Sequence, residues 1–287
     1  VVIGTQPSGQ GHETSFAQVV ADMLCKPVEQ VTIIYGDTKV VTVGGGSHSG
    51  RSMRHAGTVM MMASQDLITE GCNRAAELFG EPAENVSFED GRLYVTGTNH
   101  VITLDELAAQ DPLRPLEAAR TNEMHDPVFP NGAAACEVEI DPLTGAIELV
   151  RYTTVDDVGR CINPMIVHGQ THGGIAQGVG QAMFEDFYVE PDSGQPLSGS
   201  FMDYGMPRAG NMPSFKTEIA EVFSPTNPLG IKAGGEGGTT PALSVIVSAV
   251  LDALKSFGIS DIQMPVSPLK IWNAIQAAQA EKQLENA

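Results

Sequence analysis

The sequence predicts a mixed α+β (mixed α/β) protein whose subdomains combine mixed sheets with packed helices. Apolar residues recur at helical spacing in several long segments, and β-branched or alternating runs lie between them. Asp-Gly and Thr-Gly pairs interrupt some of the alternating runs, which is typical of hairpin turns. Helices, strands and hairpins are therefore expected along the whole chain.

The first half of the chain begins with a β-branched run, VVIG, and a turn-rich stretch, and a helix is predicted from Thr14 to Leu24. The run VTIIYG at 31–36 predicts a buried strand. A glycine-rich loop follows, and a helical pattern then extends from Ala56 to Phe79. The segment NVSFEDGRLYVTG predicts a hairpin with Asp90-Gly91 at its turn.

A proline-rich segment from Asp111 to Asn131 marks the predicted domain boundary. Its weak periodicity places the boundary near Asp126, which divides the chain into subdomains 1–125 and 126–287. The second subdomain is predicted to contain a strand, a turn at 141–145 and a second strand, a helix from Gly169 to Phe184, a strand ending near Phe223, a helix from Ala242 to Phe257, and a terminal helix from Ser267 to Gln283.

The composition excludes several kinds of partner. The chain has 287 residues and a formal net charge of −19, and such a surface repels nucleic acid and anionic membranes. No apolar run approaches the roughly 20 residues that span a bilayer, and the opening VVIGTQPSGQ lacks the basic region of a signal peptide. Because that opening also lacks an initiator methionine, we expect the sequence to be part of a longer chain.

The four cysteines, Cys25, Cys72, Cys136 and Cys161, are scattered without a CxxC pair. This spacing fits neither a zinc site nor an iron–sulfur site within the chain. Buried, reduced thiols in a cytoplasmic protein are the expected interpretation.

Three polar, glycine-rich segments lie at or near predicted helix starts: Ser8–Thr14, Gly44–Ser52 and His168–Gly180. Unpaired amides at a helix start favour anions, and glycine lets a pyrophosphate approach the backbone closely. The second segment adds the hydroxyls of Ser47, Ser49 and Ser52 and the guanidinium of Arg51, which all suit phosphate.

Plainer interpretations of these segments remain open. A glycine loop before a helix is commonly a tight connection, and the fingerprints GxGxxG and GxxxxGK[ST] are absent. Histidines at 168 and 172 lack the HExxH context of a metal site, so ordinary polar roles are favoured for them. Gln10, Gln170 and Gln177 lie beside glycines, where a side-chain amide can read the edge of a heterocycle.

The run IKAGGEGG at 231–238 surrounds one carboxylate, Glu236, with glycines. Such a loop is costly in backbone entropy, and it suits a place where the backbone packs closely against another group. A solvated acidic residue in a turn is the alternative.

Taken together, these segments resemble a known family. The segments on which the resemblance rests are GQGHETSFAQVVADML, YGDT, GRS, VDDVGRCINPMIVHGQTHGGIAQGVGQAMFED, SFMDYGMPRA, NPLGIKAGGEGG and ISDIQMPVSPLKIWNAI. In this order they resemble the C-terminal, second molybdopterin-binding half of the large subunit of molybdenum hydroxylases. This is the xanthine dehydrogenase and aldehyde oxidase superfamily, and the resemblance is nearest to its branch of aerobic carbon monoxide dehydrogenase large chains.

The resemblance implies a fold of the molybdopterin-binding type and a bound molybdopterin cytosine dinucleotide carrying molybdenum. The pterin dithiolene would hold the molybdenum, so no protein ligand to the metal is implied. The residues implied to contact the cofactor are Gly9, Gln10, Gly11, His12, Ser47, Ser49, Gly50, Arg51, Ser52, Gln170, Gly173 and Gly174. Glu236 matches the glutamate of the family's KGxGE motif, which implies a general base beside the metal.

The resemblance also implies an activity and partners. The reaction would oxidise a carbon substrate of the aldehyde, N-heterocycle or carbon monoxide type with water-derived oxygen. The implied partners are the N-terminal half of the molybdenum subunit, an iron–sulfur subunit with two [2Fe-2S] clusters, an FAD subunit and a small-molecule substrate. The sequence lacks that N-terminal half, which supplies much of the family's substrate pocket, so the substrate stays open and we expect the isolated chain to be inactive.

Two departures from the family's pattern concern the expected site. This chain reads SHSGRS where the family shows GSRS, and Ala233 replaces a glycine of the KGxGE motif. Two alternatives to the hydroxylase are a non-catalytic cofactor-binding or assembly domain of the same superfamily and an unrelated nucleotide-binding enzyme.

Overall fold

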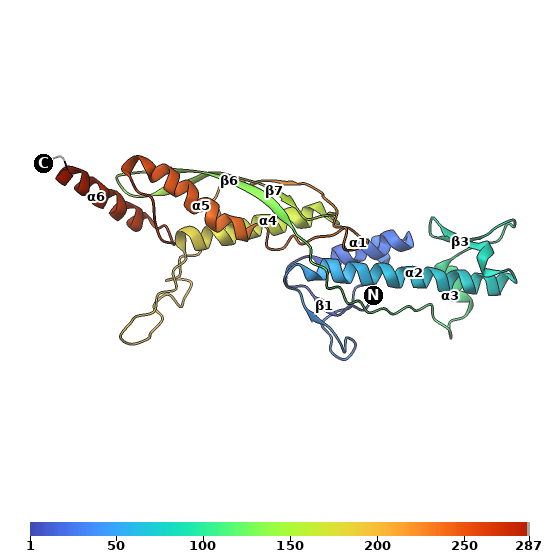
Figure 1. Cartoon of the computed structure of the whole chain (residues 1–287). Helices are drawn as coiled ribbons and strands as arrows, with labels where there is room; N and C mark the ends of the chain where they lie inside the picture. Colours follow the sequence, from blue (N-terminus) through green and yellow to red (C-terminus); the bar gives the residue numbers. More distant parts are fainter. Residues whose placement is uncertain (286–287) are drawn as a thin grey trace. The chain divides into compact units, whose positions relative to one another are not determined.

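The computed structural model describes residues 1–285 and contains two compact units (Figure 1). The first unit comprises Val1–Val128 and Phe223–Ile231, and the second comprises Phe129–Val222 and the chain from Lys232 onward. The chain therefore leaves the first unit near the expected boundary at residue 126. Unlike the expected division, it then returns to the first unit for one short segment.

The first unit is built on two helices, α1 (His12–Leu24) and α2 (Arg51–Phe79), which pack against each other. Strands β1 (Thr5–Gln6) and β2 (Gly45–Gly46) pair in parallel just before these helices. The other elements are the antiparallel sheet β3 (Val86–Glu89), β4 (Arg92–Val95) and β5 (Val101–Thr103), helix α3 (Leu104–Gln110), and the 3-10 turns η1 (Val28–Gln30) and η2 (Ala83–Asn85).

The hairpin predicted at Asp90-Gly91 is confirmed. Strands β3 and β4 pair Glu89 with Arg92, and the two turn residues have φ angles of 47° and 77°. Positive φ at both central residues is the geometry whose twist matches that of the flanking strands. Apolar side chains from this sheet, above all Leu93, pack with Ala75 of α2 in a buried cluster.

The buried strand predicted at 31–36 is wrong. Ile34 forms an isolated parallel bridge with Val2, and the Ile34 side chain is 41% exposed. An apolar run predicts burial only where another layer covers it, and a single sequence does not show where such a layer lies.

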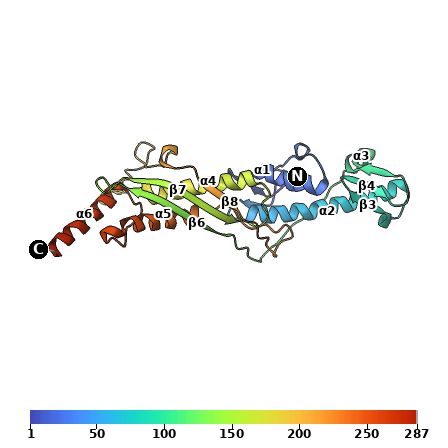
Figure 2. The same ribbon diagram turned by 90° about the horizontal axis from the view of Figure 1, so that it is seen from above.

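The second unit is a three-stranded sheet with helices packed on it (Figure 2). Strands β6 (Asn131–Ile140) and β7 (Ile147–Asp157) are antiparallel, and β8 (Lys216–Ile219) pairs in parallel with β7. The helices are α4 (Pro164–Val179), continued by a π-helical turn η3 (Gly180–Phe184), then α5 (Thr239–Leu254), the 3-10 turns η4 (Ala209–Asn211) and η5 (Lys255–Phe257), and α6 (Pro268–Glu285).

Helix α5 joins these layers, because it packs against both α4 and β6. Its residues Ile246, Val250 and Leu254 are fully buried, and they meet Tyr152 of β7 and Ile175 of α4 in one core. The mixed class of helix and sheet predicted from the sequence is confirmed.

Helix α4 corrects one expectation from the sequence. Its start was predicted at Gly169, and His168–Gly180 was also grouped with the glycine-rich loops, but the helix begins at Pro164. The side chain of Asn163 accepts a hydrogen bond from the amide of Ile166 at 3.1 Å, and proline occupies the first helical turn. Asparagine followed by proline is a strong helix start, so the glycines lie inside the helix.

The glycines of α4 have two different surroundings. A Cβ atom built on Gly178 would lie 2.4 Å from the Cβ atom of Ala242, and one on Gly174 would lie 2.8 Å from the amide nitrogen of Thr239. Both positions require glycine because α5 packs there. A Cβ atom on Gly169 or Gly173 would meet no atom of residues 1–285 within 4 Å.

The segment Thr239–Phe257, which joins α5 and η5, is long and apolar enough to cross a membrane by length and composition. The sequence-based expectation that no apolar run approaches that length is corrected here. Because α5 supplies core residues to the second unit, and core helices of protein domains pass the same test, this helix is weak evidence for a membrane span.

The packing of α4 on α5 gives a stability prediction. Gly178→Ala should lower the free energy of unfolding by about 1–3 kcal/mol, because the added methyl collides with Ala242. Gly169→Ala is the matched control on the exposed side of the same helix, and it should raise stability by about 0.5–1 kcal/mol. Urea unfolding of the purified chain measures both. Equal effects of the two substitutions would contradict the close approach of α5 to Gly178.

Candidate functional site

Two helix starts lie next to each other in the first unit. Strand β1 leads through the Ser8–Gly11 turn into α1, and β2 leads through Ser47–Gly50 into α2. The segments that precede α1 and α2, called the leads, are held together by the parallel pairing of Thr5 with Gly45 and of Gln6 with Gly46. The loops predicted from the sequence at Ser8–Thr14 and Gly44–Ser52 are thus brought together.

Glycine at two positions permits this close approach. A Cβ atom on Gly4 would lie 2.7 Å from the carbonyl oxygen of Val43, and one on Gly44 would lie 2.2 Å from the carbonyl oxygen of Gly4. A hydrogen bond of 2.6 Å from the Gly45 amide to the Gly4 oxygen completes the contact. Any larger residue at either position would push the two leads apart.

Both helices start from glycine in the left-handed region. Gly11 precedes α1 with φ of 69°, Gly50 precedes α2 with φ of 64°, and within residues 1–285 neither start carries a side-chain cap. Helix starts leave several amides without intrahelical acceptors. In α1 the Glu13 carboxylate accepts a hydrogen bond from its own amide, and the Thr14 amide donates to the Gly11 oxygen at 3.2 Å. In α2 the Arg51 amide donates to the His48 oxygen at 3.0 Å. The other first-turn amides of α1 and α2 can accept an anion.

A chain of hydroxyl groups links the two starts. The hydroxyl of Ser52 lies 2.7 Å from that of Thr5 and donates to that of Ser47 at 2.8 Å. The hydroxyl of Ser47 in turn lies 3.4 Å from Nδ1 of His12. Because Thr5, His12 and Ser52 are buried, this chain fixes the geometry of both turns.

His12 is the buried end of that chain, and its ring stacks on Phe16 with the ring centroids 4.7 Å apart. Burial lowers the pKa of His12, and the nearby carboxylate of Glu13 opposes this shift only in part. The imidazole is therefore neutral at pH 7, and it acts in the chain as a hydrogen-bonding group.

The other residues of the first unit that were predicted to contact the cofactor lie in or beside the two turns. The side-chain oxygen of Gln10 accepts a hydrogen bond from the Ser8 amide at 2.5 Å, and Nη1 of Arg51 donates to the Gly46 oxygen at 3.0 Å. Both side chains are thus held beside the turns. Gly9 and Ser49 are exposed, and a Cβ atom on Gly9 would meet no atom of the described residues within 4 Å.

The Glu236 loop belongs to the second unit, where it begins at Lys232, beside the residue that follows β7, and ends at the start of α5. A Cβ atom on Gly234 would lie 3.1 Å from the Val158 side chain, and one on Gly238 would lie 2.3 Å from the carbonyl oxygen of Thr171. The loop glycines therefore let the backbone press between the end of β7 and α4. Glu236 itself is exposed, and its carbonyl oxygen accepts a hydrogen bond of 3.2 Å from the Thr240 amide.

Of the residues predicted on α4, Gln170 reaches this loop with its side chain. A Cβ atom on Gly235 would lie 3.8 Å from Oε1 of Gln170, so the structure brings Gln170 and the Glu236 loop together. Gly173 lies on the exposed side of α4. Gly174 is buried against the start of α5, and helix packing accounts for this glycine.

A buried carboxylate beside the loop was not predicted from the sequence. Asp156 of β7 is 8% exposed, accepts a hydrogen bond from the Thr154 hydroxyl at 3.3 Å, and lies 3.6 Å from a Cβ atom built on Gly237. Burial raises the pKa of Asp156, and the hydrogen bond from Thr154 opposes the shift. The adjacent acidic pair in VDDVG, at the end of an apolar strand, was the signal that could have revealed it.

The histidines at 168 and 172 have polar structural roles, as favoured from the sequence. Nδ1 of His168 lies 2.8 Å and Nε2 of His172 lies 3.2 Å from the Thr217 hydroxyl, which attaches β8 to α4. Among residues 1–285, His, Cys, Asp and Glu side chains form no group of three or more that could hold a metal ion.

The comparison with known families identifies the class of protein. The family described as "Molybdopterin cofactor-binding domain" matches residues 1–213, so the chain belongs to that family. This confirms the resemblance inferred from the sequence motifs.

Individual relatives cover nearly the whole chain. It is 36% identical over 288 residues to the gamma subunit of the 6-hydroxypseudooxynicotine dehydrogenase complex of Paenarthrobacter nicotinovorans, which covers 96% of this chain and 36% of the relative. It is 30% identical over 282 residues to the carbon monoxide dehydrogenase large chain of Hydrogenophaga pseudoflava, covering 96% and 35%. The chain thus spans about a third of the length of these relatives.

Solved structures agree with this assignment. A crystal structure of Cu,Mo-CO dehydrogenase matches with a TM-score of 0.88 and 29% identity, covering 97% of this chain and 36% of that one. Quinoline 2-oxidoreductase from Pseudomonas putida 86 matches with a TM-score of 0.85 and 34% identity, covering 96% and 36%. The fold is therefore that of the molybdopterin-binding part of these enzymes.

The shifted pKa of Asp156 gives a pH-dependent prediction. Because the folded-state pKa lies above the unfolded value of about 3.9, the unfolded chain releases this proton first, and stability falls as pH rises through that interval. Asp156→Asn removes the titration. Relative to wild type, the variant should therefore gain stability as pH rises above about 4, measured by urea unfolding from about pH 3 to pH 7.

Asp252→Asn, on the exposed surface of α5, is the control for loss of one negative charge. A difference between Asp156→Asn and wild type that is the same at pH 3 and pH 7 would contradict the raised pKa of Asp156.

Proposed function

We propose that this chain is the molybdopterin-binding part of a molybdenum hydroxylase that oxidises a carbon substrate with water-derived oxygen. The observation that carries the proposal is the match over nearly the whole chain to Cu,Mo-CO dehydrogenase. Relatives that include a nicotine 6-hydroxylase large subunit and a xanthine dehydrogenase molybdenum-binding subunit support the same class of oxidoreductase.

The residues of the first unit fit the anionic part of such a cofactor. The starts of α1 and α2 present amides without side-chain caps among the residues that the structure describes, and hydroxyls of Ser47 and Ser49 lie on the same turns. Open space above Gly9 leaves room for a group to approach the backbone. We assign the pyrophosphate to these turns, with Gly9–His12 and Ser47–Ser52 as its contacts.

We further propose that Gln10 and Gln170 contact the heterocyclic part of the cofactor, because side-chain amides pair a donor with an acceptor. Gly173 allows close approach to α4, and Gly174 acts indirectly by letting α5 hold the Glu236 loop. The cytosine dinucleotide form of the cofactor is proposed from the similarity to carbon monoxide dehydrogenase large chains.

When bound, the molybdenum cofactor supplies the two-electron oxidation, and the pterin rather than a protein side chain holds the metal. Glu236 acts as the general base, whose carboxylate receives the proton that is released when oxygen is transferred to the substrate carbon. The glycines on both sides of Glu236 let its backbone approach the cofactor closely.

The exposure of Glu236 fits a site that further protein completes. The chain spans about a third of its relatives, which are named as a large chain and as a subunit of a complex. We propose the same partners as the sequence analysis: the other half of the molybdenum subunit, an iron–sulfur subunit with two [2Fe-2S] clusters and an FAD subunit. The isolated chain would then be inactive, and a cytoplasmic location stays a prediction.

The base assignment predicts the behaviour of Glu236→Gln in the complete enzyme. Glutamine keeps the size of the side chain but does not accept the proton, so kcat/KM should fall about 10²–10⁴-fold. Molybdenum content per enzyme should stay at the wild-type level, because Glu236 does not hold the cofactor. Steady-state kinetics and metal analysis of the same preparation test both parts.

Glu148→Gln, an exposed position on β7, is the matched control and should leave turnover unchanged. Near-normal turnover of Glu236→Gln with full molybdenum would identify Glu236 as a turn residue and contradict its role as the general base.

The cofactor contacts predict the opposite pattern for Gln10→Ala. Loss of the amide should reduce molybdenum and cytidine nucleotide content, while activity per bound molybdenum is largely kept. Gln65→Ala, on the exposed side of α2, is the control. Full cofactor loading of Gln10→Ala would remove Gln10 from the cofactor site.

A further inference from the structure

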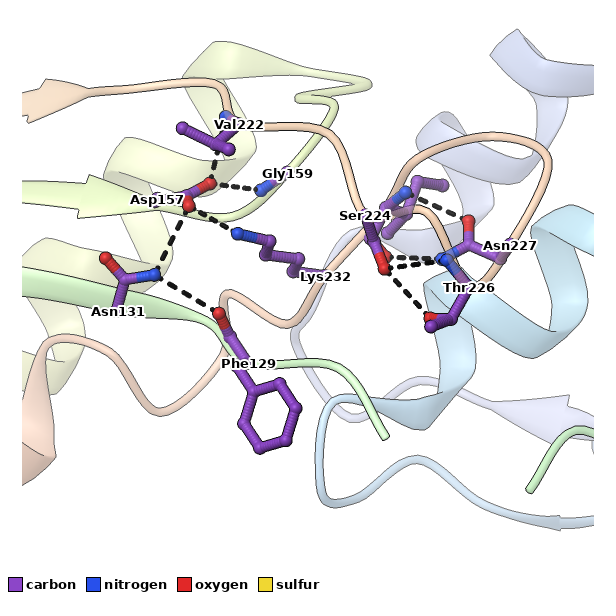
Figure 3. A network of polar contacts seen from close by, with 10 residues as sticks. Phe129, Asn131, Asp157, Gly159, Val222, Ser224, Thr226, Asn227 and Lys232 are labelled. Carbon is purple, nitrogen blue, oxygen red and sulfur yellow. Dashed lines mark hydrogen bonds and ion pairs between the residues drawn. The ribbon is translucent and has the colours of Figure 1, made fainter. Parts of the chain in front are cut away.

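The carboxylate of Asp157, at the end of β7, collects four hydrogen-bond donors (Figure 3). Its Oδ1 atom accepts from the amides of Gly159 at 2.8 Å and Val222 at 3.1 Å. Its Oδ2 atom accepts from Nζ of Lys232 at 2.5 Å and from Nδ2 of Asn131 at 3.3 Å. Both oxygens are therefore saturated.

Three of these donors lie where the chain enters or leaves the second unit. The second unit begins at Phe129, ends its first segment at Val222 and resumes at Lys232. Asn131, Val222 and Lys232 are thus at or next to the ends of its segments. One carboxylate joins these ends to β7 within the second unit.

The ion pair between Asp157 and Lys232 is buried, with the side chain of Lys232 10% exposed and that of Asp157 7% exposed. Burial by itself would raise the pKa of Asp157, but the hydrogen bonds from Lys232 and from the Gly159 and Val222 amides outweigh it and hold the pKa below its ordinary value. The carboxylate is therefore charged at neutral pH and needs the lysine, because a lone buried charge is strongly unfavourable.

Lys232 also begins the Glu236 loop. Its amide donates to the Val158 oxygen at 2.8 Å, so both backbone and side chain attach this residue to the end of β7. At the other end of the loop, Gly238 packs against Thr171 and α5 begins. The position of residues 233–237 therefore depends on the attachment of Lys232 to the end of β7 and on the packing of Gly238 against Thr171.

We propose that Asp157 and Lys232 are positioning residues that set the place of the Glu236 carboxylate. The ion pair fixes the first end of the loop, and α5 fixes the second. The effect on catalysis rests on the proposed role of Glu236, whereas the effect on the loop does not.

The test uses Lys232→Met in the complete enzyme. Methionine fills the volume of the lysine stem without its charge, so the first end of the loop loses its side-chain attachment and keeps only the amide bond to Val158. Hydrogen exchange of the amides at 233–240 should become about tenfold faster or more. With molybdenum content unchanged, kcat should fall about 10²-fold, the loss expected for a displacement of about 1 Å, while KM changes little.

Arg151→Met is the matched control. It breaks an exposed ion pair with Glu137 on the same sheet, in which Nε and Oε2 are 3.6 Å apart, and it should leave loop exchange and kcat unchanged. Loop exchange at the wild-type rate in Lys232→Met would overturn the proposal. Fast exchange over the whole second unit, equal to that at 233–240, would also overturn it, because the ion pair would then act on global stability.

A second variant covers the case in which Lys232→Met does not fold. Asp157→Asn/Lys232→Met removes both charges and leaves no lone buried ion, so it should fold. Its loop amides should still exchange faster than those of wild type, and wild-type exchange there would overturn the proposal. If Glu236→Gln proves active while these variants show a released loop, the positioning role stands and the base assignment fails.

Discussion

A carboxylate removed from water must find hydrogen-bond donors in the protein, and Asp157 finds four within the second unit. Asp157 lies at the end of the central strand β7, and three of its four donors come from segments that are distant in sequence. Without this carboxylate, Val222 and Lys232 would lose the hydrogen bonds that attach them to the end of β7. The loop geometry depends on that arrangement, and so does the proposed use of Glu236.

The second constraint is that backbone segments approach each other closely. In each unit, glycine residues permit this approach because they lack a Cβ atom. In the first unit Gly4 and Gly44 let the leads into α1 and α2 touch. In the second unit Gly174 and Gly178 let α5 pack on α4, and Gly238 lets the loop press on Thr171. These glycines have close protein neighbours, whereas a Cβ atom on Gly9 or Gly173 would meet no atom of the described residues within 4 Å.

Local patterns in the sequence predicted the elements that local physics determines. The period of α2 and the Asp90-Gly91 turn were predicted because helical spacing and positive φ need no distant partner. The strand expected at 31–36 failed because the burial of Ile34 depends on tertiary neighbours. The predicted start of α4 was wrong because its glycines suggested a loop, whereas the helix start is determined by Asn163 and Pro164.

The candidate site was predictable only in part. Motif resemblance pointed to Glu236 and to the turns before α1 and α2, but the pairing of Asp157 with Lys232 joins residues 75 positions apart. An acidic pair and a lysine at that separation carry no periodic signal. The buried state of Asp156 likewise depends on which side of β7 the rest of the unit covers.

The proposed cofactor site is tested most directly by an experimental structure of the complete enzyme with its cofactor, at a resolution that places the phosphates. Phosphate oxygens are expected within hydrogen-bonding distance of first-turn amides of α1 or α2, and the Glu236 carboxylate is expected to face the molybdenum centre. A pyrophosphate bound away from both helix starts, with Glu236 turned to solvent, would contradict the proposed site.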